Sequence, residues 1–183
     1  LSSSLAAGAA AAQPRPARKP NIIWFMADDL GWGDAGCYGQ KWIRTPNIDR
    51  LAAEGVRFTD GYAGCTVCAP SRTVADLLQG AGYRTGLFGK WGLGDISTTG
   101  VPWKRGFDEF FGFLHQAHAH FQYPRFLYHN DREYPLKGND KPGRQTYAND
   151  VMNEKSLEFI RRSKDQPFLL YASPTIPHFE PHV

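Results

Sequence analysis

The strongest constraint on the fold is an apolar run over residues 22–27 that ends in two adjacent carboxylates, Asp28 and Asp29. A short, continuous apolar run is typical of a strand buried on both faces, as in a parallel sheet. Open α/β sheets place their functional residues beyond the carboxyl ends of such strands. The run therefore predicts a buried strand that brings two carboxylates to the functional edge of an α/β sheet, where such hard oxygen ligands favour calcium or magnesium.

The two aspartates are adjacent, so on a regular strand their side chains would point to opposite faces of the sheet. Both reach one ion only if the strand ends there and the chain turns, which Gly31 favours. The alternative is an ordinary acidic pair in a loop or at a helix cap. Their position directly after an apolar run favours the metal site.

Helical and strand patterns alternate along the rest of the chain. A helix is expected to begin at Pro46, with Thr45 as its cap, and to end at Gly55. A strand is then expected over residues 56–62. The residues of this helix that are expected to face the core are Ile48, Leu51 and Ala52.

Two further pairs of a helix and a strand follow. Residues 74–80 and 148–164 are expected to be helices, and residues 83–88 and 168–172 the strands after them. The residues expected to face the core are Val74, Leu77 and Leu78 in the first of these helices and Ala148, Val151, Met152, Phe159 and Ile160 in the second. This alternation predicts a largely parallel α/β sheet flanked by helices. Residues 112–144 are aromatic and Pro-rich, which predicts an irregular, substrate-facing loop and not a core element.

The length of 183 residues suits one domain with a sizeable core. The net charge of +3 is scattered, which does not favour nucleic acid as a partner, and no apolar run is long enough for a transmembrane segment. Residues 1–13 are Ala-rich and resemble the tail of a secretory signal peptide, with a disordered leader as the alternative. We expect a signal-peptide remnant and flexible leader over residues 1–20, a folded domain over residues 21–183, and export to the periplasm or the cell exterior.

The three cysteines, Cys37, Cys65 and Cys68, cannot all pair within one chain. Cys65 and Cys68 form a C-x-x-C pair, a spacing found in redox motifs and in zinc sites. The sequence has no second such pair, so zinc or thioredoxin-like chemistry is not favoured. In an exported protein a Cys65–Cys68 disulfide is the alternative, and it would leave Cys68 without a free thiol.

Three short strings carry a family resemblance. They are residues 68–72 (Cys-Ala-Pro-Ser-Arg), residues 89–94 (Gly-Lys-Trp-Gly-Leu-Gly) and residues 176–178 (Ile-Pro-His). Together with the Asp28-Asp29 pair, they resemble the amino-terminal part of the type I sulfatases, the formylglycine-dependent arylsulfatases of the alkaline phosphatase superfamily. The resemblance implies an alkaline-phosphatase-like α/β fold that is incomplete in this chain. It also implies hydrolysis of sulfate esters of aryl compounds, other sulfated small molecules or glycans.

The resemblance implies roles for individual residues. Those in the catalytic group are Cys68, Arg72, Lys90, His178 and His118, and the calcium ligands are Asp28 and Asp29. Cys68 would be oxidised to formylglycine by a formylglycine-generating or anaerobic sulfatase-maturating enzyme, and the aldehyde hydrate would attack sulfur. Arg72 would orient the modified residue, Lys90 would stabilise negative charge, and His178 would protonate the leaving oxygen. The alternatives are that Cys68 is a small buried apolar residue and that Lys90 is a surface lysine.

One position departs from the resemblance, because most sulfatases have a histidine where Gly92 stands. A subgroup of bacterial arylsulfatases shares this glycine and continues with a string similar to residues 116–124, Gln-Ala-His-Ala-His-Phe-Gln-Tyr-Pro. Similarity to that subgroup implies that His118 or His120 supplies the missing imidazole. The alternative is that both are loop histidines exposed to solvent.

Two parts of the family pattern are missing. Arg72 is followed directly by Thr73 and residues 74–78, so the segment that follows the cysteine motif in the family is expected to be deleted. The family's further calcium ligands are expected beyond Val183, which leaves two carboxylates for an ion that takes about six to eight oxygens. The alternatives to an active sulfatase are an inactive truncated remnant and a phosphoester or phosphonate hydrolase of the same superfamily.

Overall fold

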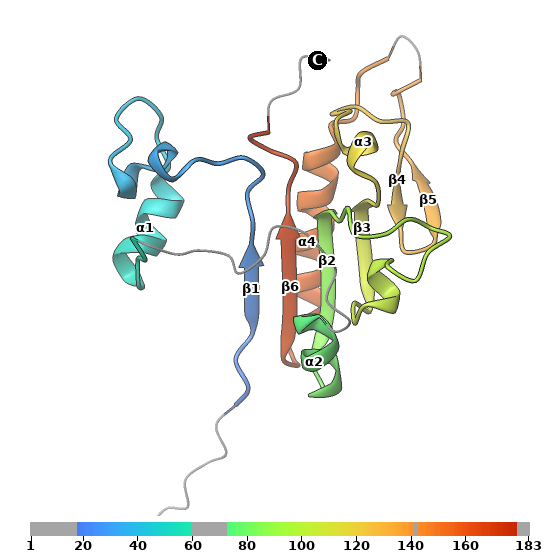
Figure 1. Cartoon of the computed structure of the whole chain (residues 1–183), viewed down its shortest axis with the longest axis horizontal. Coiled ribbons are helices and arrows are strands. Elements are labelled where there is room, and N and C mark those ends of the chain that lie inside the picture. The colour runs from blue at the N-terminus through green and yellow to red at the C-terminus, as the bar shows by residue number, and fades with distance from the viewer. Residues whose placement is uncertain (1–17, 60–72, 141–142, 179–183) are drawn as a thin grey trace, which may run out of the picture.

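The computed structural model describes residues 18–59, 73–140 and 143–178. A six-stranded sheet with the strand order β1-β6-β2-β3-β4-β5 forms its centre (Figure 1). In that order the strands are Ile22–Phe25, Phe168–Ser173, Arg84–Lys90, Glu109–Phe113, Phe126–His129 and Arg132–Pro135. The helices are η1 (Trp32–Asp34), η2 (Gly36–Tyr38), α1 (Pro46–Glu54), α2 (Val74–Gly80), η3 (Pro102–Lys104), α3 (Gln116–Ala119) and α4 (Ala148–Ser163). No helix among these is long and apolar enough to cross a membrane.

Four neighbouring strands, β1, β6, β2 and β3, are parallel, and β4 and β5 add an antiparallel hairpin at one edge. The hairpin turns at Asn130, whose left-handed φ of 51° is one that asparagine tolerates. The turn is tied to β3, because Asn130 N–H donates to Phe110 O and Phe110 N–H donates to the Asn130 side-chain oxygen. The prediction of a largely parallel α/β sheet flanked by helices is confirmed.

The prediction that residues 112–144 form an irregular loop is wrong. This segment contains the end of β3, α3, β4 and β5, and several of its side chains belong to the core. The buried apolar residues in it are Phe113, Leu114, Ala119, Leu127 and Leu136. Each of α3, β4 and β5 is only 4 residues long, which is too short for a helical or strand period to appear in the sequence.

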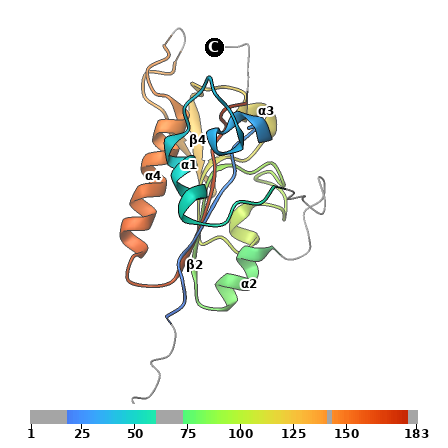
Figure 2. The same cartoon turned by 90° about the vertical axis from the view of Figure 1, so that its left-hand side faces the viewer.

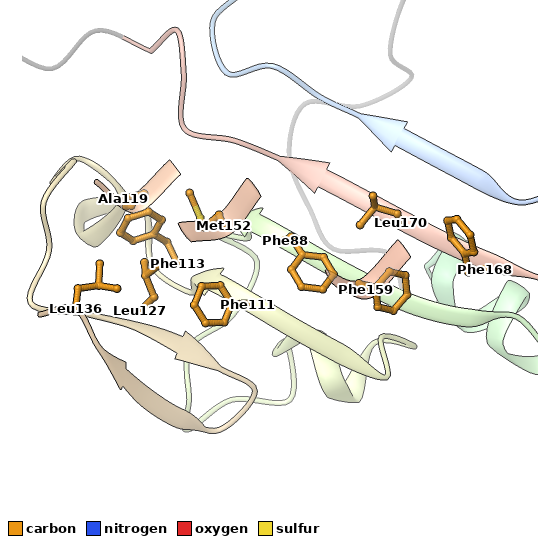
Figure 3. Packing of buried hydrophobic residues seen from close by; sticks show 11 residues of the cluster. Phe88, Phe111, Phe113, Ala119, Leu127, Leu136, Met152, Phe159, Phe168 and Leu170 are labelled. Carbon is orange, nitrogen blue, oxygen red and sulfur yellow. The ribbon is translucent and has the colours of Figure 1, made fainter. Parts of the chain in front are cut away.

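The larger core cluster lies between the sheet and α4, which covers one face of the sheet (Figures 2 and 3). Phe159 on α4 is fully buried, and its ring centre lies 5.4 Å from that of Phe88 and 5.9 Å from that of Phe168. Gly86 on β2 makes room for it, because a Cβ there would come within 2.8 Å of the Phe159 ring. The prediction of this helix is confirmed, with Ala148, Met152 and Phe159 buried and Val151 and Ile160 partly buried.

The second core cluster lies on the opposite face of the sheet, on the side of α2 (Figure 2). α2 begins with a capping box, in which Asp76 N–H donates to Thr73 Oγ1 and Thr73 N–H donates to Asp76 Oδ2. The helix ends at Gly80, as predicted, and β2 follows at Arg84.

Two of the side chains predicted to face the core from α2 are exposed. Val74 is 51% and Leu77 61% exposed, whereas Ala75 is buried and Leu78 is partly buried. The first turn of α2 approaches the backbone at Gly106 so closely that a Cβ there would lie 2.2 Å from an α2 backbone nitrogen. The prediction for Val74 and Leu77 is wrong because this close approach selects the small side chain of Ala75 for the contact.

The first strand forms, but it is not buried as predicted. β1 lies at an edge of the sheet, and Ile23, Trp24 and Phe25 are 58%, 51% and 63% exposed. Within the described part of the chain, β1 pairs with β6 alone. The prediction of a strand buried on both faces is wrong because no described helix covers β1.

α1 begins and ends where the sequence predicts, between Thr45 and Gly55, but it does not cover the sheet (Figure 1). It is held beside η2, since Cys37 N–H donates to Asp49 Oδ1 over 2.7 Å. The predicted core-facing residues are wrong, because Ile48 and Leu51 are exposed and Ala52 is only partly buried. Residues 56–59, the described part of the strand predicted over 56–62, are not a strand.

Candidate active site

The carboxylates of Asp28 and Asp29 lie at the carboxyl end of β1, where the strand ends in a sharp turn. Asp28 N–H donates to Ile176 O, so this residue still follows the parallel pairing of β1 with the chain beyond β6. Asp29 adopts a left-handed φ of 61°, a conformation that aspartate tolerates better than most residues. The turn brings both carboxylates to one side, which is the condition that sequence analysis set for a shared ion.

His178 joins the two aspartates from the chain that follows β6. Its Nδ1 lies 2.5 Å from Asp29 Oδ2 and 4.0 Å from Asp28 Oδ2. An ionised carboxylate only accepts hydrogen bonds, so Nδ1–H donates to Asp29 and Nε2 is the nitrogen left to act on another molecule. Ligand atoms of these three residues lie within 4.8 Å of one another, which is close enough to hold one metal ion.

Lys90 reaches the Asp28 carboxylate from the end of β2. Its Nζ lies 2.6 Å from Asp28 Oδ2, and both side chains are largely buried. The backbone before Lys90 is fixed against β6, because a Cβ at Gly89, with φ of 136°, would come within 1.9 Å of Ser173 O. Ser173 Oγ also donates to Lys90 O. The close packing of β2 on β6 therefore sets where the ammonium group lies.

The four side chains combine two carboxylates with an ammonium group and an imidazole, a set that suits a hard cation and an anionic ligand. Asp28 and Asp29 are the carboxylates, and Lys90 and His178 provide the opposing ammonium and imidazole. Two carboxylates are oxygen ligands of the kind that calcium prefers, but they supply only part of the about six to eight oxygens that it takes. The donor set fits calcium in kind, with Lys90 and His178 placed to meet the negative charge of a ligand beside the ion.

Replacing Lys90 with Met is expected to raise the affinity of this cluster for calcium about fivefold, because a positive charge 2.6 Å from Asp28 Oδ2 opposes a second cation. Isothermal titration with calcium measures the change. Lys104→Met, which removes an exposed lysine on η3, is the matched control and should leave the affinity unchanged. Equal affinity of K90M and the unmodified protein would show that Asp28 is not a ligand.

The two histidines at α3 differ in their surroundings. His118 packs against the rings of Phe113 and Phe126, with ring centres 5.1 and 4.8 Å away. Burial, and to a smaller extent the nearby His115, lower the pKa of the His118 imidazole. It is His120 whose ring lies 5.3 Å from that of His178. Of the two imidazoles that sequence analysis considered, the structure therefore places His120 beside the cluster.

Gly92 explains how the chain accommodates the missing histidine. With φ of 80°, it adopts a conformation that favours glycine, and a Cβ there would lie 2.2 Å from Gln116 Nε2. The side chain of Gln116, at the start of α3, thus occupies the space beside this backbone. Gly92 and Gln116 are therefore neighbours in the structure, so a larger residue at position 92 would require the Gln116 side chain to move.

The remaining predicted site residues, Cys68 and Arg72, lie outside the described residues, as do Cys65 and the leader up to residue 17. Cys37 is a free cysteine. The described chain resumes at Thr73, whose Oγ1 donates to Arg105 O and fixes the start of α2.

Sequence analysis missed a buried polar link behind the site. Asn149 on α4 donates to Thr175 Oγ1 over 2.9 Å and to Gln122 Oε1 over 3.0 Å, and it accepts from Thr175 N–H. Thr175 lies three residues before His178, so the link holds the chain that carries the imidazole. The signal was present in the sequence, because Asn149 lies three residues before Met152 on the core-facing side of α4.

Asn149→Ala is expected to lower the free energy of unfolding by about 1–3 kcal/mol, because it leaves buried partners without their hydrogen bonds. Urea denaturation measures the loss. Asn153→Ala, an exposed asparagine on the same helix, is the matched control and should cost under about 0.5 kcal/mol. Equal stability of the two variants would contradict a structural role for the link.

Comparison with known proteins shows which family this chain is similar to. The sulfatase family model matches residues 20–75 and 72–183. Mouse steryl-sulfatase is 40% identical over 151 residues, which cover 59% of this chain and 24% of that protein, and human arylsulfatase A is 40% identical over 143 residues, which cover 60% and 27%. The chain thus spans about a quarter of the length of these relatives.

A solved structure gives the same result for the fold. The structure of BT4656 in complex with its substrate D-glucosamine-2-N,6-O-disulfate superposes with a TM-score of 0.68 at 30% identity, over 88% of this chain and 35% of that one. The family match changes segment at residues 72–75, where sequence analysis expects a deletion. The 151 aligned positions of steryl-sulfatase also exceed the part of this 183-residue chain that they cover, so the relative has residues within the aligned region that this chain lacks.

Proposed function

Because the chain belongs to the sulfatase family, we propose that it forms the amino-terminal part of the active site of a sulfuric ester hydrolase. The observation that carries the proposal is that three neighbouring parallel strands end together and bring Asp28, Lys90 and His178 within ion-pair distance. Because the chain spans about a quarter of its relatives, the activity of the whole protein is part of the proposal.

The proposed substrate is an aryl sulfate or a sulfated saccharide. The substrate in the BT4656 complex is a sulfated glucosamine, which supports the saccharide class. Lys90 would meet the negative charge of the sulfate oxygens, and His178, in the form that carries a proton on both ring nitrogens, would donate the Nε2 proton to the leaving oxygen as its bond to sulfur breaks. His120, beside His178, is a second imidazole at the same place.

The proposed cofactors are calcium and a formylglycine made from Cys68. Asp28 and Asp29 would hold the ion, with further ligands from outside the described residues. The hydrated aldehyde supplies an oxygen nucleophile for sulfur, and Arg72 would neutralise charge beside it. A formylglycine-generating or anaerobic sulfatase-maturating enzyme is the partner that this modification requires, and the Ala-rich leader favours export from the cytoplasm.

The test is hydrolysis of 4-nitrophenyl sulfate by the protein expressed together with a maturating enzyme, with mass spectrometry of the peptide that contains Cys68. An aldehyde at Cys68 and calcium-dependent release of nitrophenol, both lost in Cys68→Ala, are the expected results. Faster hydrolysis of 4-nitrophenyl phosphate, without the aldehyde, would instead support a phosphoester hydrolase of the same superfamily.

The alternative is that the protein has no enzymatic activity and is a sulfatase remnant that no longer turns over substrate. The specific observation in its favour is the edge strand β1, whose apolar residues Ile23, Trp24 and Phe25 are exposed beside the carboxylates. A soluble protein that melts cooperatively but neither acquires the aldehyde nor hydrolyses sulfate esters would establish this alternative.

A further inference from the structure

A cavity beside α3 lies apart from the cluster of Asp28, Lys90 and His178. Its volume is about 570 Å³, which is large enough for a sugar unit, and the residues that line it include two arginines and three residues with aromatic rings, Phe121, Tyr123 and Phe126. Among the lining residues are Arg125, Asn139 and Arg144. Resting on the proposed function, we propose that this cavity binds the neighbouring sugar unit of a sulfated glycan, one that carries its own sulfate or carboxylate.

The cavity and the candidate active site share one piece of chain. His118 lines the cavity, and His120, two residues later, lies against His178. Gln122, between the lining residues Phe121 and Tyr123, accepts from Asn149, the residue that also holds Thr175. Figure 1 shows α3 at the same end of the sheet as the carboxyl end of β6. The segment 118–123 therefore reaches from the wall of the cavity to the imidazole of His178.

The charges of the cavity favour an anion. Arg125 pairs with Asp140 at 3.4 Å, but both side chains are largely exposed, so that pair is weak and can exchange for a ligand. Arg144 is exposed and has no acidic partner within the described residues. A guanidinium presents a planar fork that matches the oxygens of sulfate and carboxylate. The two arginines among the lining residues therefore favour an anionic ligand over a metal ion.

The aromatic side chains favour a sugar as the carrier of that anion. Phe121 is 55% exposed at the cavity, and Tyr123 lies with its ring centre 5.5 Å from that of Tyr147. Exposed aromatic faces beside convergent polar groups are typical of pockets that hold a small cyclic ligand. Two arginines without a longer basic stripe do not suit a nucleic acid backbone.

The wall that carries Arg144 is fixed before a ligand binds. Asn139 is buried, and its amide donates to Pro124 O and Thr146 O, both over 2.8 Å. Its side-chain oxygen accepts from Thr146 N–H and Gln145 N–H. These bonds tie the chain on both sides of Arg144 to the segment before Arg125, so binding does not have to order the loop residues beside Arg144.

The test measures binding and not turnover. Isothermal titration uses a heparin disaccharide with sulfate on both sugar units as the probe, and the desulfated disaccharide as the reference. Arg144→Gln is expected to weaken binding of the sulfated probe about tenfold, and Phe121→Ala about fivefold. Arg161→Gln on α4 and Phe58→Ala, an exposed arginine and an exposed phenylalanine elsewhere, are the matched controls and should bind as the unmodified protein does.

Other outcomes separate this inference from the proposed function. If Arg144→Gln binds the probe normally while His178→Ala loses it, recognition is confined to the sulfate-ester site and the cavity is not a subsite. Equal binding of the desulfated disaccharide, or no binding of the sulfated one, also overturns the inference. Binding that depends on Arg144 in a protein that hydrolyses no sulfate ester would keep the subsite and reject the proposed function.

Discussion

Asp28→Asn is expected to weaken calcium binding by about 100-fold or more and to abolish any sulfate-ester hydrolysis. Asp28 is the residue on which the cluster converges, with Lys90 Nζ at 2.6 Å and His178 Nδ1 at 4.0 Å from Oδ2. The change keeps the size of the side chain but removes a charged ligand of the ion, and loss of an indirect partner alone costs about 10- to 100-fold. Calcium titration of the purified protein measures the loss.

The matched control for this prediction is Asp165→Asn, an exposed aspartate after α4. It should leave calcium affinity and thermal stability unchanged, because surface substitutions of this kind cost under about 0.5 kcal/mol. If D28N and D165N bind calcium equally, the ion lies elsewhere and the assignment of the two aspartates is wrong. Circular dichroism of both variants confirms that the fold is kept.

Phe159→Ala is expected to lower the free energy of unfolding by about 3–5 kcal/mol, the usual cost of removing a buried aromatic ring. Phe159 is fully buried between α4 and the sheet, in contact with Phe88 and Phe168 and beneath the guanidinium of Arg84 at 5.5 Å. For a domain whose total stability is about 5–15 kcal/mol, this loss is large. Urea denaturation followed by tryptophan fluorescence measures it.

Leu157→Ala on the same helix is the control, because Leu157 is 43% exposed and contributes little buried area. It should cost under about 1 kcal/mol. A similar loss for both variants would mean that α4 does not pack on the sheet through Phe159. The two variants together test the face of α4 that covers the core in Figure 3.

The parts of the fold that the sequence predicts well are those with a local signal. α1 begins at the proline that follows Thr45, although the Thr45 side chain makes no capping hydrogen bond, α2 begins after a capping threonine, and α4 has an apolar stripe long enough to show its period. β2 and β6 are largely buried inner strands of the sheet. In each case the residues that determine the element are its own.

The errors concern what covers an element, which local sequence does not encode. The apolar residues of β1 and α1 predict burial, but burial needs a second surface, and none of the described elements provides one. The prediction for residues 112–144 is wrong for another reason, because α3, β4 and β5 are too short to show a helical or strand period in the sequence.

The candidate site was predictable as residue types but not as geometry. The motifs point to Asp28, Asp29, Lys90 and His178, and the structure brings these four together. The choice between His118 and His120 could not be made from sequence, because it depends on which ring packs against Phe113 and Phe126. Cys68 and Arg72 stay predictions, since they lie outside the described residues.

The contact between Asp29 and His178 joins residues 149 positions apart in the chain. During synthesis the two aspartates leave the ribosome before His178 does. β1 can therefore pair with its described neighbour β6 only after the strands between them in sequence have been made. Such a long-range pairing is slow to form, because the entropy cost of closing a large loop comes before any stabilising contact is made. The two aspartates and His178 therefore come together only after residue 178 has been made and β1 has paired with β6. If the three residues bind calcium, the onset of binding would report when the two strands pair.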